Sequence, residues 1–81
     1  MYIVTMSKQE ADKTYTGKEF KLELSPYHKL RVKVTGTRVY GGVVFCLVKL
    51  VKILYADKHD KTDYRQLRKG TEQVLAGRLT V

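Results

Sequence analysis

Apolar and polar positions alternate in two stretches of the first half of the chain, residues 19–24 and residues 29–35. Alternation at a period of two is typical of a strand with one face buried. Between the two stretches lies Pro26, which cannot donate to a strand ladder. We therefore predict two half-buried strands separated by a turn over residues 25–28. The side chains predicted to face the core are Phe20, Leu22, Leu24, Leu30, Val32 and Val34.

Residues 43–55 form the most hydrophobic segment, with eleven apolar side chains among thirteen, interrupted by Lys49 and Lys52. Its many β-branched residues disfavour a helix, and the preceding Gly41-Gly42 pair is typical of a turn, so we favour one long strand. A straight strand of that length would extend about 43 Å, so we expect a bend or bulge. A one-residue bulge near residues 50–51 would bring the two lysines onto one side. A helix is the alternative, because the two lysines share one helical face.

The remaining N-terminal segments carry weaker patterns. Residues 2–6 suggest a short strand. Ser7 and Glu10 have the spacing of a capping box, but no apolar period follows, so we expect at most one helical turn or a polar loop through residue 13. Thr16-Gly17-Lys18 predicts a turn, and Gly36 permits another.

The C-terminal third begins with a charged loop over residues 56–63. Thr62 can cap a short helix from about Asp63 to Lys69, which we expect to dock on the sheet through Tyr64 and Leu67. Residues 74–81 then suggest a closing strand bent at Gly77, with a helical turn over residues 71–75 as the alternative. The side chains expected on one face of that strand are Leu75, Leu79 and Val81.

These elements predict a single domain over residues 1–81 of mostly β class. We expect a small, strongly twisted antiparallel sheet, or partly open barrel, of about five strands with one short helix near the C-terminus. SH3-type and OB-type barrels have this general architecture, although fold analogy carries little functional information. The alternative is an α+β domain in which residues 43–69 are helical.

The single cysteine, Cys46, cannot form an internal disulfide and lies among apolar neighbours, so we expect a buried, inert thiol. This use of cysteine suits a reducing compartment. The first residues lack the basic-then-apolar order of a signal peptide, and residues 43–55 are too short to cross a bilayer. We therefore expect a cytoplasmic protein that does not enter a membrane.

Charge is distributed unevenly along the chain, whose formal net charge is +8. Basic and acidic residues balance over residues 1–27, and residues 56–81 contribute +2. The middle third contributes +6, since residues 25–56 contain no carboxylate. The six uncompensated cations are Lys29, Arg31, Lys33, Arg38, Lys49 and Lys52.

A basic strand face without carboxylates predicts binding to the phosphate backbone of nucleic acid, either DNA or RNA. Arg31 and Arg38 should contribute most, because a guanidinium can grip a phosphate with two hydrogen bonds. Tyr27, Tyr40 and Tyr55 flank the segment and could offer rings for stacking on bases, with half-buried packing at strand ends as the alternative. The plain alternative is a basic surface that only keeps a small protein in solution.

A second hypothesis is a protein-binding inhibitor or adaptor module. In one register of the long strand, Val43, Phe45 and Leu47 face away from the core, and an exposed apolar face needs a cover. A second copy of the chain, giving a homo-oligomer, or a partner protein with an acidic surface could provide it. Packing by other segments of the same chain is the alternative.

The sequence predicts no catalytic site, metal site or cofactor. His28 and His59 fall in predicted loops without a serine, cysteine or carboxylate partner at a catalytic spacing. Asp57, Asp60 and Asp63 cluster around His59, but their spacing matches neither a calcium loop nor a zinc site. We interpret this cluster as a charged turn that precedes a helix.

Overall fold

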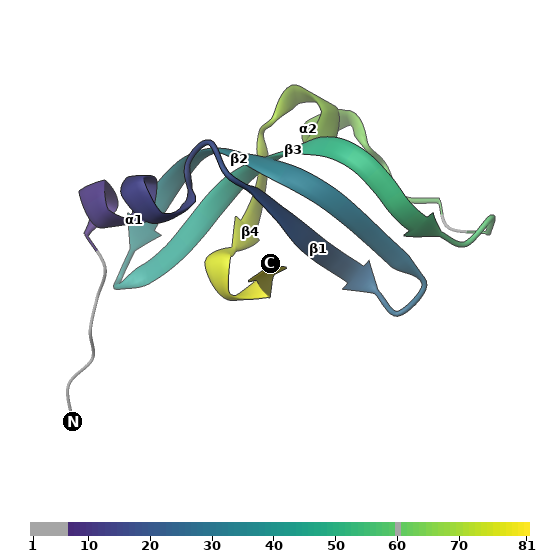
Figure 1. Cartoon of the computed structure of the whole chain (residues 1–81), viewed down its shortest axis with the longest axis horizontal. Helices are drawn as coiled ribbons and strands as arrows, with labels where there is room; N and C mark the ends of the chain where they lie inside the picture. The colour runs from purple at the N-terminus through teal and green to yellow at the C-terminus, as the bar shows by residue number, and fades with distance from the viewer. Residues whose placement is uncertain (1–6, 60) are drawn as a thin grey trace.

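The computed structural model describes residues 7–59 and 61–81, which fold into one five-stranded antiparallel sheet with strand order β4-β3-β2-β1-β5 (Figure 1). The predicted mostly β fold with a twisted, unclosed sheet is confirmed. The expected strand over residues 2–6 lies outside the described residues. The elements in chain order are α1 (Lys8–Tyr15), β1 (Glu19–Ser25), β2 (His28–Tyr40), β3 (Val43–Ala56), α2 (Arg65–Lys69), β4 (Glu72–Leu75), the 3₁₀ turn η1 (Ala76–Arg78) and β5 (Leu79–Thr80).

The long hairpin of β2 and β3 is the centre of the sheet. Gly41 and Gly42 form its turn with φ values of 55° and 81°, a left-handed conformation that glycine adopts without strain. The prediction of a long strand over residues 43–55 is confirmed, and the helical alternative for residues 43–69 is wrong. Leu50 lies opposite Val32 and Lys52 opposite Arg31, so the predicted bulge is present at Val51.

Gly36 does not form the predicted turn, because β2 continues through it to Tyr40. Val34 lies opposite Val48 and Gly36 opposite Leu47, which leaves Thr35 as an extra residue. A bulge of this kind bends a strand without reversing the chain. The bend therefore replaces the turn and lets a long strand fit a small domain.

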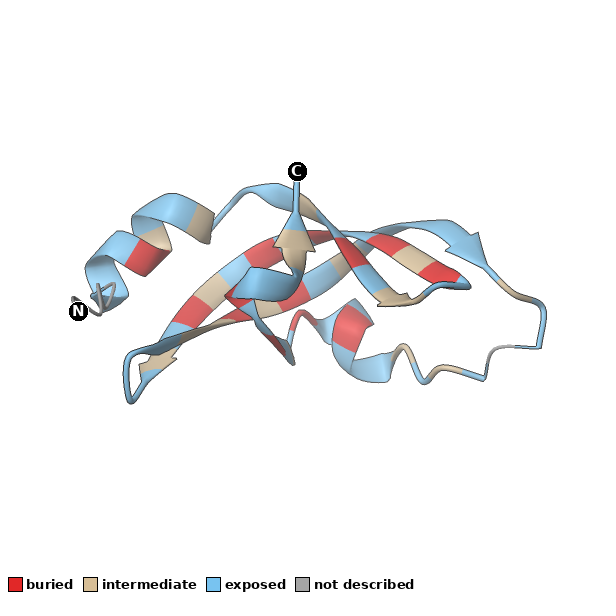
Figure 2. Ribbon diagram, turned by 90° about the horizontal axis from the view of Figure 1, so that it is seen from below, coloured by how far each residue is buried: buried red, intermediate tan, exposed pale blue. Residues whose placement is uncertain are grey.

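The core lies on one side of the sheet, where β1 and β2 direct alternate residues inward, as predicted. Figure 2 shows buried and exposed positions alternating along β2. Tyr64 packs against this core and Leu67 is buried in it, which confirms that the segment around α2 docks on the sheet. The core residues are Leu22, Leu30, Val32, Val34, Cys46, Val48, Leu67, Val74 and Ala76.

The C-terminal residues do not form the single predicted strand, nor the alternative helical turn at residues 71–75. β4 pairs with β3 at one edge of the sheet, η1 turns at Ala76–Arg78, and β5 pairs with β1 at the other edge. The predicted face is also wrong, since Val74 is buried and Leu75 is 44% exposed. The sheet curls so strongly that one 3₁₀ turn carries the chain between its two edges.

The N-terminal helix α1 is longer than expected. Ser7 caps it by accepting a hydrogen bond from the Glu10 backbone N–H at 3.2 Å, as predicted, but the helix continues to Tyr15. Its only buried residue is Ala11, and one buried position gives no apolar period from which a docked helix could be predicted. The Asp12 carboxylate accepts a 2.5 Å hydrogen bond from the buried Thr37 hydroxyl of β2, which holds the helix on the sheet.

Helix α2 begins at Arg65 with Tyr64 as its N-cap, so the predicted cap at Thr62 is wrong. The Thr62 hydroxyl instead lies 3.1 Å from Nδ1 of His28, and the Tyr64 hydroxyl lies 2.5 Å from Nε2. His28 was expected in a loop, but it is the first residue of β2 and fully buried. These hydroxyls supply polar partners for the buried imidazole, which a buried polar group requires.

Candidate nucleic-acid interface

One row of three cations crosses the outward face of the sheet. Arg31 on β2 lies directly opposite Lys21 on β1 and directly opposite Lys52 on β3, and all three side chains are exposed. Residues that face each other across antiparallel strands point to the same side of the sheet. Since neighbouring strands lie about 4.8 Å apart, three positive charges occupy a strip roughly 10 Å long.

A second pair of cations lies beside this row. Lys33 is two residues from Arg31 on the same face of β2, and it lies opposite Lys49 on β3. The bulge at Val51 is what allows Lys49 and Lys52, three residues apart, to share one face. We call the resulting surface the basic face. Its residues are Lys21, Arg31, Lys33, Lys49 and Lys52.

The charges of the basic face form no ion pair with a described carboxylate. Between the residues that the structure describes, ion pairs form within α1 and between Asp63 and Arg65, and none includes a side chain of the basic face. Two carboxylates lie at its border on β1, where Glu19 faces Lys33 and Glu23 faces Lys29. The acid-free stretch of sequence therefore does not produce an entirely acid-free face, because β1 brings these two residues beside it.

The two remaining predicted cations lie away from the centre of this surface. Lys29 is half-buried and belongs to the next row, between Glu23 and Tyr55. Arg38 is exposed opposite Phe45, beyond the bend at Thr35 and near the β2–β3 turn.

Two of the three predicted stacking residues, Tyr27 and Tyr40, lie at opposite ends of the β2 region. Tyr27 is in the β1–β2 turn and is 63% exposed. Tyr40 ends β2 and is 55% exposed, with its ring centroid 5.9 Å from that of Phe45. The molecule is 44 Å long, so no single stacking platform contains both rings.

The predicted partner interface has unequal exposure. Val43 is exposed, whereas Phe45 and Leu47 are half-buried and lie opposite Leu75 and Gln73 of β4. The other half of β3 is more open, since every residue from Val51 to Ala56 is exposed. The large apolar side chains exposed there are Val51, Ile53, Leu54 and Tyr55.

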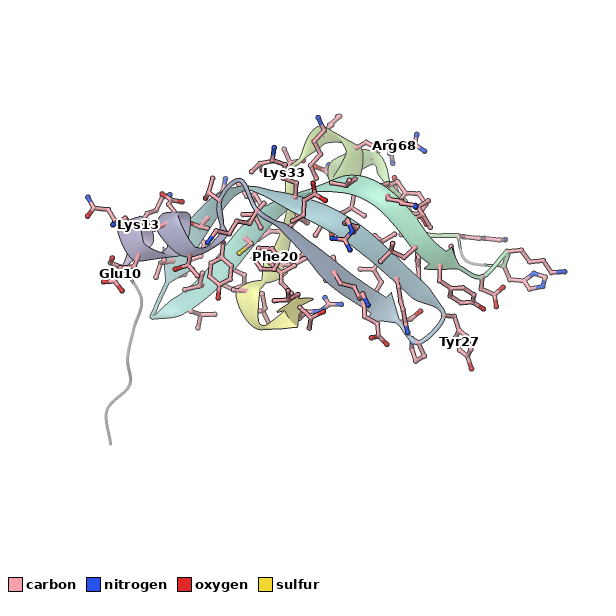
Figure 3. All side chains as sticks on the ribbon, in the orientation of Figure 1. Glu10, Lys13, Phe20, Tyr27, Lys33 and Arg68 are labelled. Carbon is pink, nitrogen blue, oxygen red and sulfur yellow. The ribbon has the colours of Figure 1, made fainter. Side chains whose placement is uncertain are left out.

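Three basic residues near this surface were missed from the sequence. Lys21 could have been found by pairing β1 with β2 around the short turn at Pro26. Arg68 and Lys69 end α2, and the next residue, Gly70, rests against the basic face: a Cβ at Gly70 would lie 3.4 Å from the Lys49 Cβ. Figure 3 shows Lys33 and Arg68 on the same upper side of the molecule.

The other candidate chemical groups are the Cys46 thiol and the cluster of acidic residues around His59. Burial raises the pKa of the Cys46 thiol to about 11, which keeps it protonated near neutral pH and confirms the expectation of a buried, unreactive cysteine. Within residues 7–59 and 61–81, no three histidine, cysteine or acidic side chains gather closely enough to share a metal ion. Asp60 of the predicted charged cluster lies outside the described residues.

No helix in the described part of the chain is both long and apolar enough to span a bilayer. Comparison of the chain with protein-family models, with curated proteins and with solved structures gives no match.

Proposed function

We propose that this protein binds nucleic acid through the phosphate backbone, with the basic face as the contact surface. The observation that supports the proposal is the row of Lys21, Arg31 and Lys52 across three strands. Like charges directly opposite each other in a sheet are destabilising, and no described carboxylate forms an ion pair with them. A bound polyanion would supply the missing negative charge.

The roles of the residues follow from their chemistry. Arg31 lies at the centre of the row and presents a planar guanidinium that can donate two parallel hydrogen bonds to one phosphate. The lysines act as point charges toward neighbouring phosphates. Contacts of this kind position a nucleic acid without reading its sequence, so we propose a non-catalytic protein with weak sequence preference. The free, buried Cys46 is compatible with a reducing compartment, and we propose that the binding occurs in the cytoplasm.

A salt titration tests the proposal directly. The probes are a fluorescein-labelled 16-nucleotide DNA strand of mixed sequence and the duplex made from it, followed by fluorescence anisotropy. If the basic face neutralises about four phosphates, log affinity should fall against log salt with a slope of about −2.8 for the single strand and about −3.6 for the duplex. A flat salt response for both probes would contradict the proposal.

A charge-reversal variant with a matched control identifies the surface. Arg31→Glu with Lys33→Glu should abolish binding to both probes, because both side chains are exposed on the basic face. The control is Lys13→Glu with Lys58→Glu, which makes the same change in net charge at exposed positions on α1 and in the turn after β3. Circular dichroism checks that both variants fold. Equal losses in the two variants would show that net charge, and not this face, determines binding.

A protein-binding inhibitor or adaptor is the second candidate function, favoured by the apolar side chains exposed on β3. Val51, Ile53 and Leu54 lie beside Lys52, so an acidic protein surface with apolar side chains would complement them. Binding of that kind depends on the apolar contact as well as on charge. Ile53→Ser should then abolish binding to an identified partner while leaving DNA binding within about twofold, because it removes the apolar side chain without changing the charge.

A further inference from the structure

Tyr55 lies on the same outward face as the row of cations, in the adjacent row. It is directly opposite Lys29, which is two residues from Arg31 on β2. Same-face neighbours along a strand are about 6.6 Å apart, so the tyrosine row borders the cation row directly. The residue is 53% exposed, and its neighbour Leu54 is also exposed. A phenol ring thus lies one row from Arg31 and Lys52, on a surface open to solvent.

An aromatic ring beside a phosphate-binding row suits a nucleic acid whose bases are accessible. Stacking of a base on an aromatic side chain contributes about 1–3 kcal/mol and tolerates any base, because every base has a π-face. In a duplex these faces are covered by neighbouring base pairs, so a ring on a sheet surface reaches them only in a single strand.

The border of the basic face also favours a single strand. Glu19 and Glu23 lie on β1 on either side of Lys21 and flank the end of the cation row. A duplex presents two phosphate strands, and a second strand that extended beyond β1 would approach these carboxylates. A narrow strip of cations with Tyr55 along one side matches one phosphate strand with its bases turned toward the ring.

We infer that the basic face binds single-stranded nucleic acid in preference to duplex, with a base stacked on Tyr55. This inference rests on the proposed function and adds the strandedness of the ligand and a residue that recognises its bases. The phosphates contact Lys21, Arg31 and Lys52, and the base of a neighbouring nucleotide covers the exposed ring.

The test compares the 16-nucleotide single strand with its duplex at 100 mM NaCl. Wild type should bind the single strand more tightly. Tyr55→Leu should weaken single-strand binding by about tenfold or more, the effect of losing one stacked base, and should change duplex binding by less than twofold. Tyr55→Phe keeps the ring and should bind like wild type.

A measurement on the unaltered protein keeps the test independent of how the variants fold. Photocrosslinking of wild type to the same strand carrying 5-iodouracil, followed by mass spectrometry, should identify Tyr55 as the attachment point. Duplex binding as tight as single-strand binding, an unaffected Tyr55→Leu variant, or crosslinks located only elsewhere would overturn the inference. If Arg31→Glu with Lys33→Glu still abolished binding in those cases, the proposed function would stand. If neither probe bound wild type, both would fail.

Discussion

Two single-residue contacts fix elements that the sequence pattern leaves loosely specified. Asp12 accepts hydrogen bonds from Thr37 and Lys8, and these interactions, led by the Thr37 hydroxyl, hold the pKa of its carboxyl below the usual range. The Thr35 hydroxyl donates a 2.8 Å hydrogen bond to the Gly70 carbonyl, which joins β2 to the end of α2. The Asp12–Thr37 contact joins residues 25 positions apart in the sequence, and the Thr35–Gly70 contact joins residues 35 positions apart.

Gly70 gives a prediction at this scale. Its φ of 79° lies in the left-handed region, and a Cβ there would approach the Thr35 Cγ2 to 3.2 Å. Gly70→Ala should lose about 1–2 kcal/mol from the strained backbone and about 1 kcal/mol more if the Thr35 hydrogen bond is disrupted. Urea unfolding measures the free energy.

Gly17→Ala is the matched control for this substitution. Gly17 has a φ of 83°, but a Cβ there meets nothing within 4 Å, so only the backbone cost applies. The difference between the two variants isolates the contact of the end of α2 with Thr35 on β2. Equal destabilisation would show that this contact does not hold the helix in place.

At the scale of elements, the sequence predicts strands that bury one face and fails where packing is sparse. Alternation predicted the inward residues of β1 and β2 because every second side chain enters the core. α1 was underestimated because Ala11 alone is buried. The C-terminal strand was misjudged because β4 has only four residues, and η1 interrupts the period before β5. The register of two paired strands can be predicted from the hairpin that joins them. A three-residue 3₁₀ turn such as η1 has no hydrophobic period from which to predict it.

The outer edge of β3 gives a prediction for an element. β4 covers this edge only from Phe45 to Val48, and no other described strand pairs with the rest. Bulges and an exposed lysine are features that discourage edge-to-edge pairing, and this edge has extra residues at Val51 and Leu54 beside Lys52. Lys52→Val should therefore promote self-association, measured by sedimentation velocity. Lys58→Val, in the nearby turn, is the control and should sediment like wild type; similar behaviour of both variants would count against a protective role for Lys52.

For the molecule as a whole, the sequence predicted that one sheet face is positively charged but not which residues form and border that face. The excess charge in the middle third indicated a basic strand face, and the pairing of β2 with β3 brings Arg31, Lys33, Lys49 and Lys52 together. The net charge of a segment could not exclude Arg38 from the basic face. Arg38 lies beyond the bend at Thr35, and no sequence pattern predicts that bend. Nor could it reveal Glu19 and Glu23, which reach this face only through pairing of β1 with β2.

The basic face should also limit the stability of the whole molecule. Lys52 opposes Arg31 directly, and a carboxylate at that position would replace repulsion with attraction worth roughly 0.2–1 kcal/mol. Lys52→Glu should therefore raise the urea midpoint at 20 mM NaCl, and salt should reduce the gain as it screens both interactions. The same substitution should weaken DNA binding, because it removes one cation and adds a negative charge. Lys13→Glu on α1 equals it in net charge and should give a smaller gain. If Lys52→Glu left stability at low salt unchanged, the cations would not repel one another enough to require an anionic ligand, and the main support for a phosphate-binding face would be lost.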